Sequence, residues 1–163
     1  MCSVNSPQTS TLAEHHDVLR QALADVGEHS FCAYVESCDP ARFAEEASLV
    51  PSWVRSSVLF DGAFGGAVLL AVPDALGRDL FGAFLGAEPG LVPLDGALFD
   101  LVGELTNMVC GAWLTRACQG RFELRHPEVS RMRPDESHPD GRDCLLFLIN
   151  DQPCYLRLAL ANR

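Results

Sequence analysis

The stretch 100-DLVGELTNMVCGAWL-114 carries side chains whose types and spacing could do chemistry. If it winds as an α-helix, at roughly 100° per residue, one side presents a narrow polar stripe. This stripe consists of Asp100, Glu104, Asn107 and Gly111, and no lysine or arginine accompanies its two carboxylates. Because burying an unpaired charge costs several kcal/mol, the stripe must face water or a binding partner.

The rest of this helix is apolar, which predicts that it docks on a core. The residues concerned are Leu98, Leu101, Val102, Leu105, Met108, Val109, Ala112 and Trp113. A solvated outer face is the ordinary explanation of the polar stripe, but Gly111 weighs against it. A glycine inside an exposed helix lowers helix stability by about 1 kcal/mol relative to alanine. We therefore expect the missing side chain to let another segment come close to the helix. Either a partner's backbone or another helix of the same fold could make that approach.

The whole chain has 163 residues, which predicts one domain with a real core. Apolar residues make up 48% of the chain and charged residues 21%, so wholesale disorder is excluded. We expect a flexible tail over residues 1–10 and a folded domain over 11–163. The N-terminus lacks the basic start and apolar core of a secretory signal, and no run approaches the roughly 18 apolar residues of a membrane span, so we expect a cytoplasmic protein.

The charged residues and the cysteines limit which kinds of partner and metal site this chain can have. With 22 acidic against 12 basic residues, the net charge is −10, which argues against nucleic acid or an anionic membrane as the main partner. Seven cysteines lie scattered through apolar segments without the close pairs that ligate zinc. We therefore expect reduced, mostly buried thiols and no metal ligands on this chain.

Periodicity and turn signals predict the elements that position the stripe. Thr11 and Glu14 have the spacing of a capping box that starts a first helix, which should end at Gly27. A β-prone run over 31–37 follows. Segments 53–60 and 67–72 form a predicted β-hairpin whose loop contains Phe64, and Pro73-Asp74 opens a second helix over 74–86.

The third and longest predicted helix covers about residues 94 to 119 and carries the polar stripe. After it, strands are expected over 121–125, 144–149 and 154–160, with a turn at 150–153 and a polar loop over 133–143. This order predicts an α+β fold: a single domain in which an antiparallel-rich sheet packs against long helices.

The stripe and its surroundings resemble a known family. The sequence ELTNMVCG from Glu104 to Gly111, preceded by Asp100, is similar to the E-x-x-N signature of the CheX/CheC chemotaxis phosphatases. The glycine-rich hairpin 60–70, the helix start at 73–76 and the FLG at 84–86 agree with the same family. The resemblance covers roughly residues 53 to 113. A single E-x-x-N makes the chain closer to CheX than to CheC, whose members typically carry two.

The resemblance implies a function for each stripe residue. Members of this family hydrolyse the aspartyl phosphate of a CheY-like receiver domain, so Asn107 and Glu104 would be the catalytic pair. Asn107 would position the attacking water, and Glu104 would pair with the receiver's lysine. Asp100, Glu104 and Gly111 would bind the partner. Mg²⁺ would belong to the receiver's acidic pocket, so no cofactor is expected on this chain.

The sequence leaves two alternative functions open and suggests an oligomeric state. A non-catalytic adaptor with the same fold could bind a receiver or a sensory protein, although such a binder would have no chemical need for Asn107. A relative of the flagellar switch proteins is less favoured. A homodimer is expected by analogy with CheX, through an edge strand from 144–149 or 154–160.

The histidines suggest no catalytic role. His15 and His16 are adjacent on the first helix and cannot both face one ligand site, so we interpret them as surface or interface residues. His126 and His138 each precede a proline, and neither has a partner at a spacing that indicates catalysis.

Overall fold

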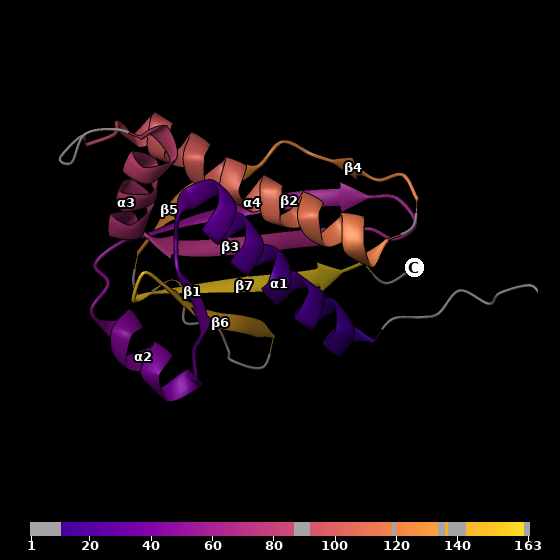
Figure 1. The fold of residues 1–163 in the computed structure, drawn as a ribbon, viewed down its shortest axis with the longest axis horizontal. Coiled ribbons are helices and arrows are strands. Elements are labelled where there is room, and N and C mark those ends of the chain that lie inside the picture. The colour runs from indigo at the N-terminus through magenta and orange to yellow at the C-terminus, as the bar shows by residue number, and fades with distance from the viewer. Residues whose placement is uncertain (1–10, 87–91, 119, 134–135, 137–142, 162–163) are drawn as a thin grey trace, which may run out of the picture.

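The computed structural model describes residues 11–86, 92–118, 120–133, 136 and 143–161. Four helices and the strands of one antiparallel sheet follow one another in the described residues in the order α1 (Leu12–Phe31), β1 (Val35–Ser37), α2 (Pro40–Ser48), β2 (Trp53–Asp61), β3 (Gly66–Pro73), α3 (Asp74–Leu85), α4 (Asp95–Ala117), β4 (Glu123–Leu124), β5 (Glu128–Met132), β6 (Cys144–Ile149) and β7 (Gln152–Leu160). The predicted α+β fold with long helices on an antiparallel sheet is confirmed (Figure 1).

The sheet has the order β1-β6-β7-β3-β2, and the last strand pairs with both β4 and β5. The predicted hairpin is β2–β3, in register from Trp53 opposite Pro73 to Phe60 opposite Gly66. β6 and β7 meet at a two-residue turn, Asn150-Asp151, in which both residues have positive φ. This turn is tighter than the expected 150–153 because β7 already begins at Gln152.

The main core lies between one face of the sheet and the helices α1 and α4, which cross it together (Figure 1). Strand alternation directs Val54, Val58 and Phe60 of β2 into this core. The most deeply buried part of α4 includes Leu105, which is 2% exposed, and Trp113, which is 0% exposed. Arg116 on α4 forms an ion pair with Asp25 on α1, so the two helices are also linked at the surface.

A second, smaller core lies on the opposite face of the sheet, beneath α2. It consists of Phe43, Ala47, Val50, Trp53, Ala71, Met132, Leu146 and Tyr155. The sequence analysis missed this helix, although Asp39 caps it, Pro40 occupies its first turn, and Phe43 and Ala47 have helical spacing. It also missed β5, whose residues are mostly exposed.

The boundary of α1 differs from the prediction. Gly27 does not end the helix, which continues to Phe31 and closes at Cys32 in the left-handed conformation. The glycine instead allows a close approach, since a Cβ there would lie 2.7 Å from Val35 Cγ2. The predicted β-prone run over 31–37 is therefore a strand only from Val35 to Ser37.

The interpretation of His15 as a surface or interface residue was wrong. Its side chain is 7% exposed and packs edge-on against Trp113 and near Phe64, with ring centroids 5.6 and 5.7 Å away. Burial lowers the pKa of His15, which favours the neutral imidazole in this apolar site. His16 is half-buried, and His138 lies outside the described residues.

The cysteines are less buried than expected. Only Cys110 and Cys154 of the six described are buried, while Cys32 is exposed and the other three are intermediate. Burial raises the pKa of the Cys110 thiol to about 12, which makes it unreactive at neutral pH.

The expected pairing of an edge strand with a second copy also needs correction. β7 lies between β6 and β3, and β6 lies between β7 and β1, so neither of the expected segments is an edge strand over its full length. A homodimer stays a prediction.

The hairpin provides a test of the fold. A Cβ on Gly66 would lie 2.2 Å from the Ala159 carbonyl oxygen and 2.7 Å from Phe60 Cζ. We expect Gly66→Ala to lower the free energy of unfolding by about 2–3 kcal/mol, because the added methyl group would force the backbone of β7 at Ala159 to shift. Urea unfolding followed by circular dichroism measures this change. Gly82→Ala on α3, where a Cβ meets nothing within 4 Å, should be neutral or stabilise the protein; equal losses for both variants would contradict the register described.

Candidate functional site

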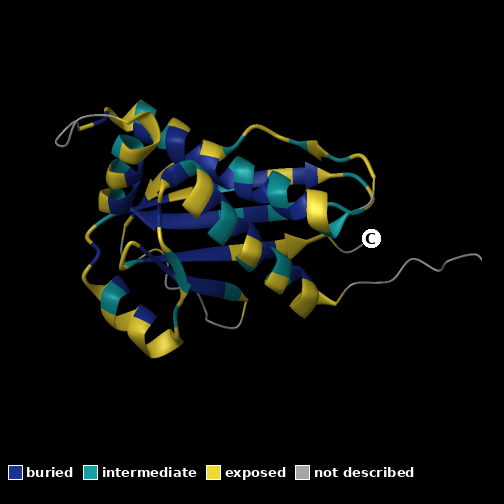
Figure 2. Cartoon of the chain, viewed as in Figure 1, coloured by how far each residue is buried: buried dark blue, intermediate teal, exposed yellow. Residues whose placement is uncertain are grey.

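The polar stripe lies on α4 where the sequence predicts it. Asp100 and Glu104 are exposed, and Asn107 and Gly111 are intermediate in burial. Figure 2 shows buried, intermediate and exposed positions following one another along α4. Leu105 and Val109 are buried behind them, as expected, whereas Met108 is only half-buried. The prediction that Glu104 and Asn107 lie on one exposed helical face is confirmed for Glu104, while Asn107 on the same face is half-buried.

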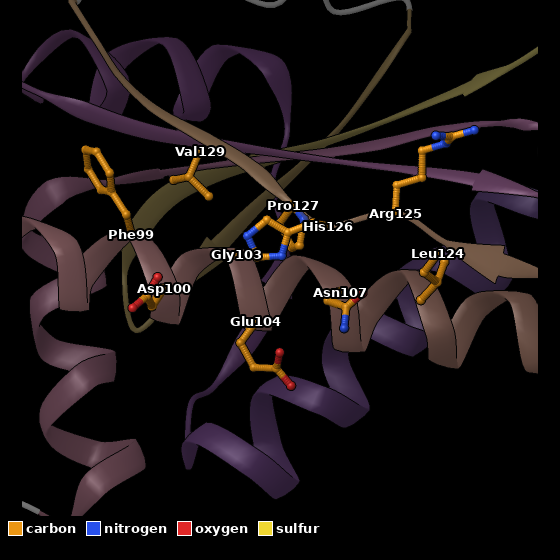
Figure 3. A pocket seen from close by; sticks show the side chains of 10 residues that line it. All are labelled: Phe99, Asp100, Gly103, Glu104, Asn107, Leu124, Arg125, His126, Pro127 and Val129. Carbon is orange, nitrogen blue, oxygen red and sulfur yellow. The ribbon is translucent and has the colours of Figure 1, made fainter.

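The stripe forms one wall of a pocket of about 660 Å³ (Figure 3). The α4 wall consists of Phe99, Asp100, Gly103, Glu104 and Asn107; the opposite wall consists of Leu124, Arg125, His126, Pro127 and Val129. Gly111 does not line the pocket. The sequence analysis identified the helical wall and missed the second wall, which follows α4 along the chain and returns beside it.

A β-bulge shapes the second wall. Leu124 lies opposite Phe60 of β2, and Glu128 lies opposite Ser57. Four residue steps along the β4–β5 segment therefore match three steps along β2, which leaves one extra residue at 125–127. The Arg125 amide donates to the Leu59 carbonyl at 2.8 Å, so the bulge stays attached to the sheet.

Gly103 allows the second wall to approach the helix. A Cβ at this buried position would lie 3.2 Å from Val129 Cγ2 and 3.3 Å from Pro127 Cβ, both closer than ordinary contact. At Gly111 a Cβ would meet only Leu124 Cδ1, at 3.8 Å. The close approach that the sequence analysis associated with Gly111 thus occurs inside the fold at Gly103, where the segment 127–129 makes it.

An ion-pair network fixes β5 to the start of α4. Arg131 donates to both carboxylate oxygens of Asp95, at 2.9 and 3.0 Å, and to Asp74 on α3 at 2.7 Å. Its guanidinium carbon also lies 5.6 Å from the ring centroid of Phe99, which lines the pocket. The two walls are therefore joined at this end of the pocket.

The network lowers the pKa values of its two carboxyl groups, Asp95 and Asp74. The hydrogen bond from Arg131 lowers the pKa of Asp95. Partial burial raises the pKa of Asp74, but hydrogen bonds from Arg78 and Arg131 outweigh this effect and hold that pKa below its ordinary value. Both carboxylates therefore stay ionised and paired at neutral pH.

The two acids of the stripe lack such pairing. Within the described residues, neither Asp100 nor Glu104 makes a side-chain hydrogen bond or an ion pair, although both line the pocket. The second wall adds Arg125 and His126, both exposed. The pocket therefore combines two unpaired acids and an amide with a cation and an imidazole, which suits a partner that carries charges of both signs.

Two further observations limit the chemistry. Over the described ranges, no three His, Cys, Asp or Glu side chains gather in a way that could hold a metal ion. The expectation that this chain needs no cofactor stays a prediction. No described helix is long and apolar enough to cross a membrane.

Comparison with known proteins settles the family. The family model "Chemotaxis phosphatase CheX" matches residues 54–150, a span that includes α4 and both walls of the pocket. The chain belongs to the CheX family. No curated protein matches it.

Solved structures share the fold of this CheX chain. The chemotaxis protein CheX from Vibrio vulnificus is 18% identical, with a TM-score of 0.69 over 94% of this chain and 100% of that one. CheX from Desulfovibrio desulfuricans is 14% identical, with a TM-score of 0.66 over 91% and 99%. CheX from Borrelia burgdorferi, solved as a CheX–CheY–BeF₃–Mg²⁺ complex, is 11% identical, with a TM-score of 0.61 over 91% and 98%.

Gly111 provides a test of the partner-binding role expected for it. Because the space for a Cβ is free and alanine favours helix, Gly111→Ala should raise the free energy of unfolding by about 0.5–1 kcal/mol. If a partner's backbone approaches this position, the same variant should bind that partner more weakly. Thermal unfolding and isothermal titration calorimetry measure the two effects separately. Unchanged affinity in a stabilised variant would remove Gly111 from the partner-binding set.

Proposed function

We propose that this CheX-family chain hydrolyses the aspartyl phosphate of a CheY-like receiver domain. The observation that carries the proposal is the placement of Glu104 and Asn107, one turn apart on α4, at the wall of one pocket. In the reaction, a water oxygen attacks phosphorus and the bond from phosphorus to the aspartyl oxygen breaks. The products are inorganic phosphate and the receiver's free carboxylate.

Asn107 has the role of positioning that water. An acyl phosphate is reactive enough that catalysis mainly requires a water in line with the bond that breaks. A carboxamide both accepts from and donates to water, and it brings no negative charge toward the phosphoryl group. The half-buried side chain of Asn107 is held on a helix whose other face is packed, which supports this role.

Glu104 has the role of fixing the register of the partner. Its exposed carboxylate is unpaired within the described chain, so it is available to the lysine that receivers hold beside the phosphoryl group. Asp100, one turn earlier and also exposed, either extends this pairing or solvates the helix. Mg²⁺ is expected in the receiver's acidic pocket rather than on this chain.

The alternative is an adaptor that binds a receiver without hydrolysis. The unpaired acids would suit either function, but the amide at Asn107 has a chemical purpose only in the phosphatase. Phosphate release from phosphorylated receivers of the same genome, with and without this protein, distinguishes the two. Acceleration of release supports the phosphatase; binding without acceleration for every receiver supports the adaptor.

Asn107→Ala tests the mechanism. Because the amide acts on the water, this variant should keep its affinity for the receiver while the rate of catalysed phosphate release falls by roughly 10²–10³-fold. Asn107→Asp should be no better than alanine, since it adds repulsion toward the phosphoryl group and loses the donor. Full activity of Asn107→Ala on a receiver that the native protein dephosphorylates would refute the mechanism.

Glu104 is tested through the salt dependence of the complex. Screening shortens the Debye length from about 10 Å at 0.1 M to about 3 Å at 1 M salt, which weakens an exposed ion pair. Added salt should therefore raise the dissociation rate of the native complex more than that of Glu104→Ala. Surface plasmon resonance measures both rates. Glu104→Lys should bind more weakly than Glu104→Ala because it faces the receiver's lysine with a like charge; equal salt dependence of the native protein and Glu104→Ala would remove this ion pair.

A further inference from the structure

One pocket residue has no role in the function proposed above. His126 is exposed and lines the wall opposite Glu104 and Asn107. Its sequence position gives no catalytic signal, because its neighbours in space come from α4, about twenty residues earlier in the chain. Only the return of the chain beside the helix brings this imidazole to the pocket.

The bulge is what turns His126 toward the helix. In a regular strand, successive side chains point to opposite faces. Here the four consecutive residues Leu124, Arg125, His126 and Pro127 all line the same pocket. The extra residue between Leu124, opposite Phe60, and Glu128, opposite Ser57, removes the alternation. Bulges commonly redirect a side chain in this way beside functional sites.

The segment that carries His126 is held on three sides. The hydrogen bond from the Arg125 amide to the Leu59 carbonyl attaches it to the sheet, at 2.8 Å. Pro127 packs on the bare surface of Gly103. Arg131, a few residues on, joins β5 to Asp95 at the start of α4. A side chain on such a support can be positioned accurately relative to Asn107.

The direction of the side chains separates His126 from its neighbour. Figure 3 shows the His126 ring over Gly103, between Asp100 and Asn107, whereas the Arg125 side chain extends away from α4. Ionised Asp100 and Glu104 can only accept hydrogen bonds, and the Asn107 amide is assigned to water. The imidazole N–H of His126 then remains as the hydrogen-bond donor near the centre of the stripe, and it is available to an anionic oxygen.

We propose that His126 is a substrate-binding residue that donates an N–H to an anionic oxygen of the partner's phosphoryl group. This inference rests on the proposed phosphatase function and deepens it. The donor stabilises negative charge on the phosphoryl oxygens while Asn107 holds the water and Glu104 pairs with the lysine. The pocket then has separate contacts for the receiver's lysine and the attacking water, both from α4, and one for the phosphoryl oxygen, from the bulge.

Two variants at this position isolate the N–H from the ring. His126→Phe keeps a ring of similar shape without a donor, and His126→Gln replaces the ring but keeps an N–H donor. We expect His126→Phe to lower kcat/KM for phosphate release by about 10–100-fold, the range of a hydrogen bond to a charged group. His126→Gln should stay within about five-fold of the native protein. His29→Ala, an exposed histidine on α1 outside the pocket, is the matched control and should keep native activity.

A second readout reports contact directly. The probe is a receiver domain loaded with Mg²⁺ and beryllofluoride, a stable mimic of the phosphoryl group. Binding should shift the side-chain ¹⁵N resonances of His126 but not those of His29, and His126→Phe should bind this probe about 10-fold or more weakly. A structural role alone would not move the ring resonances in this selective way.

The outcomes separate this inference from the proposed function. Native activity in His126→Phe, or a loss in His126→Gln as large as that in His126→Phe, would overturn the role of the N–H while the phosphatase stands. A native chain that binds the beryllofluoride receiver but releases no phosphate would overturn the phosphatase, and the resonance shift and the affinity of His126→Phe would then decide the contact. A native chain that neither binds the beryllofluoride receiver nor releases phosphate would overturn both the phosphatase function and the His126 contact.

Discussion

The site depends on the packing of α4 across the sheet. Leu105, Val109 and Trp113 are at most 2% exposed, so this face of the helix cannot rotate without bringing large apolar surface into water. Each such side chain contributes roughly 1.5–3 kcal/mol when fully buried. With 3.6 residues per turn, fixing this face also fixes the direction of Glu104 and Asn107. The core therefore positions the polar stripe, and no contact within the stripe is needed to do so.

The second wall is positioned by a different set of forces. Gly103 lets Pro127 and Val129 lie closer to the helix than a side chain there would permit, and β2 holds the bulge by its backbone. Arg131 then joins β5 to Asp95 at the start of α4. Because the helix is held mainly by apolar burial and the bulge by backbone pairing, a substitution away from Gly103 and the Arg131–Asp95 pair need not displace the opposite wall.

The sequence predicted the parts of this arrangement that depend on local periodicity. The helix expected over about 94–119 is Asp95–Ala117, and the hairpin around Phe64 lies where it was expected. The second wall was not predictable in the same way, since a strand as short and exposed as β5 has no clear alternation and a bulge is a property of pairing between distant segments. The sequence analysis singled out Gly111 and did not consider Gly103, because only the three-dimensional structure shows which glycine another segment approaches. His15 was misplaced for a related reason: its partners Trp113 and Phe64 come from other elements.

The contrast between the acids of α4 bears on why the stripe contains no arginine, the residue that supplies every basic side chain of this chain. Asp95, on the first turn, is paired with Arg131, and this pair joins α4 to β5. Asp100 and Glu104 have no such partner among the described residues, although Arg125 lies on the same pocket. An arginine four residues away on the helix would pair with them internally, and a binding partner's cation would then have to displace it. Acids that stay unpaired and hydrated lose only water when a partner's cation arrives, so the charge imbalance of the stripe favours binding between molecules over pairing within one.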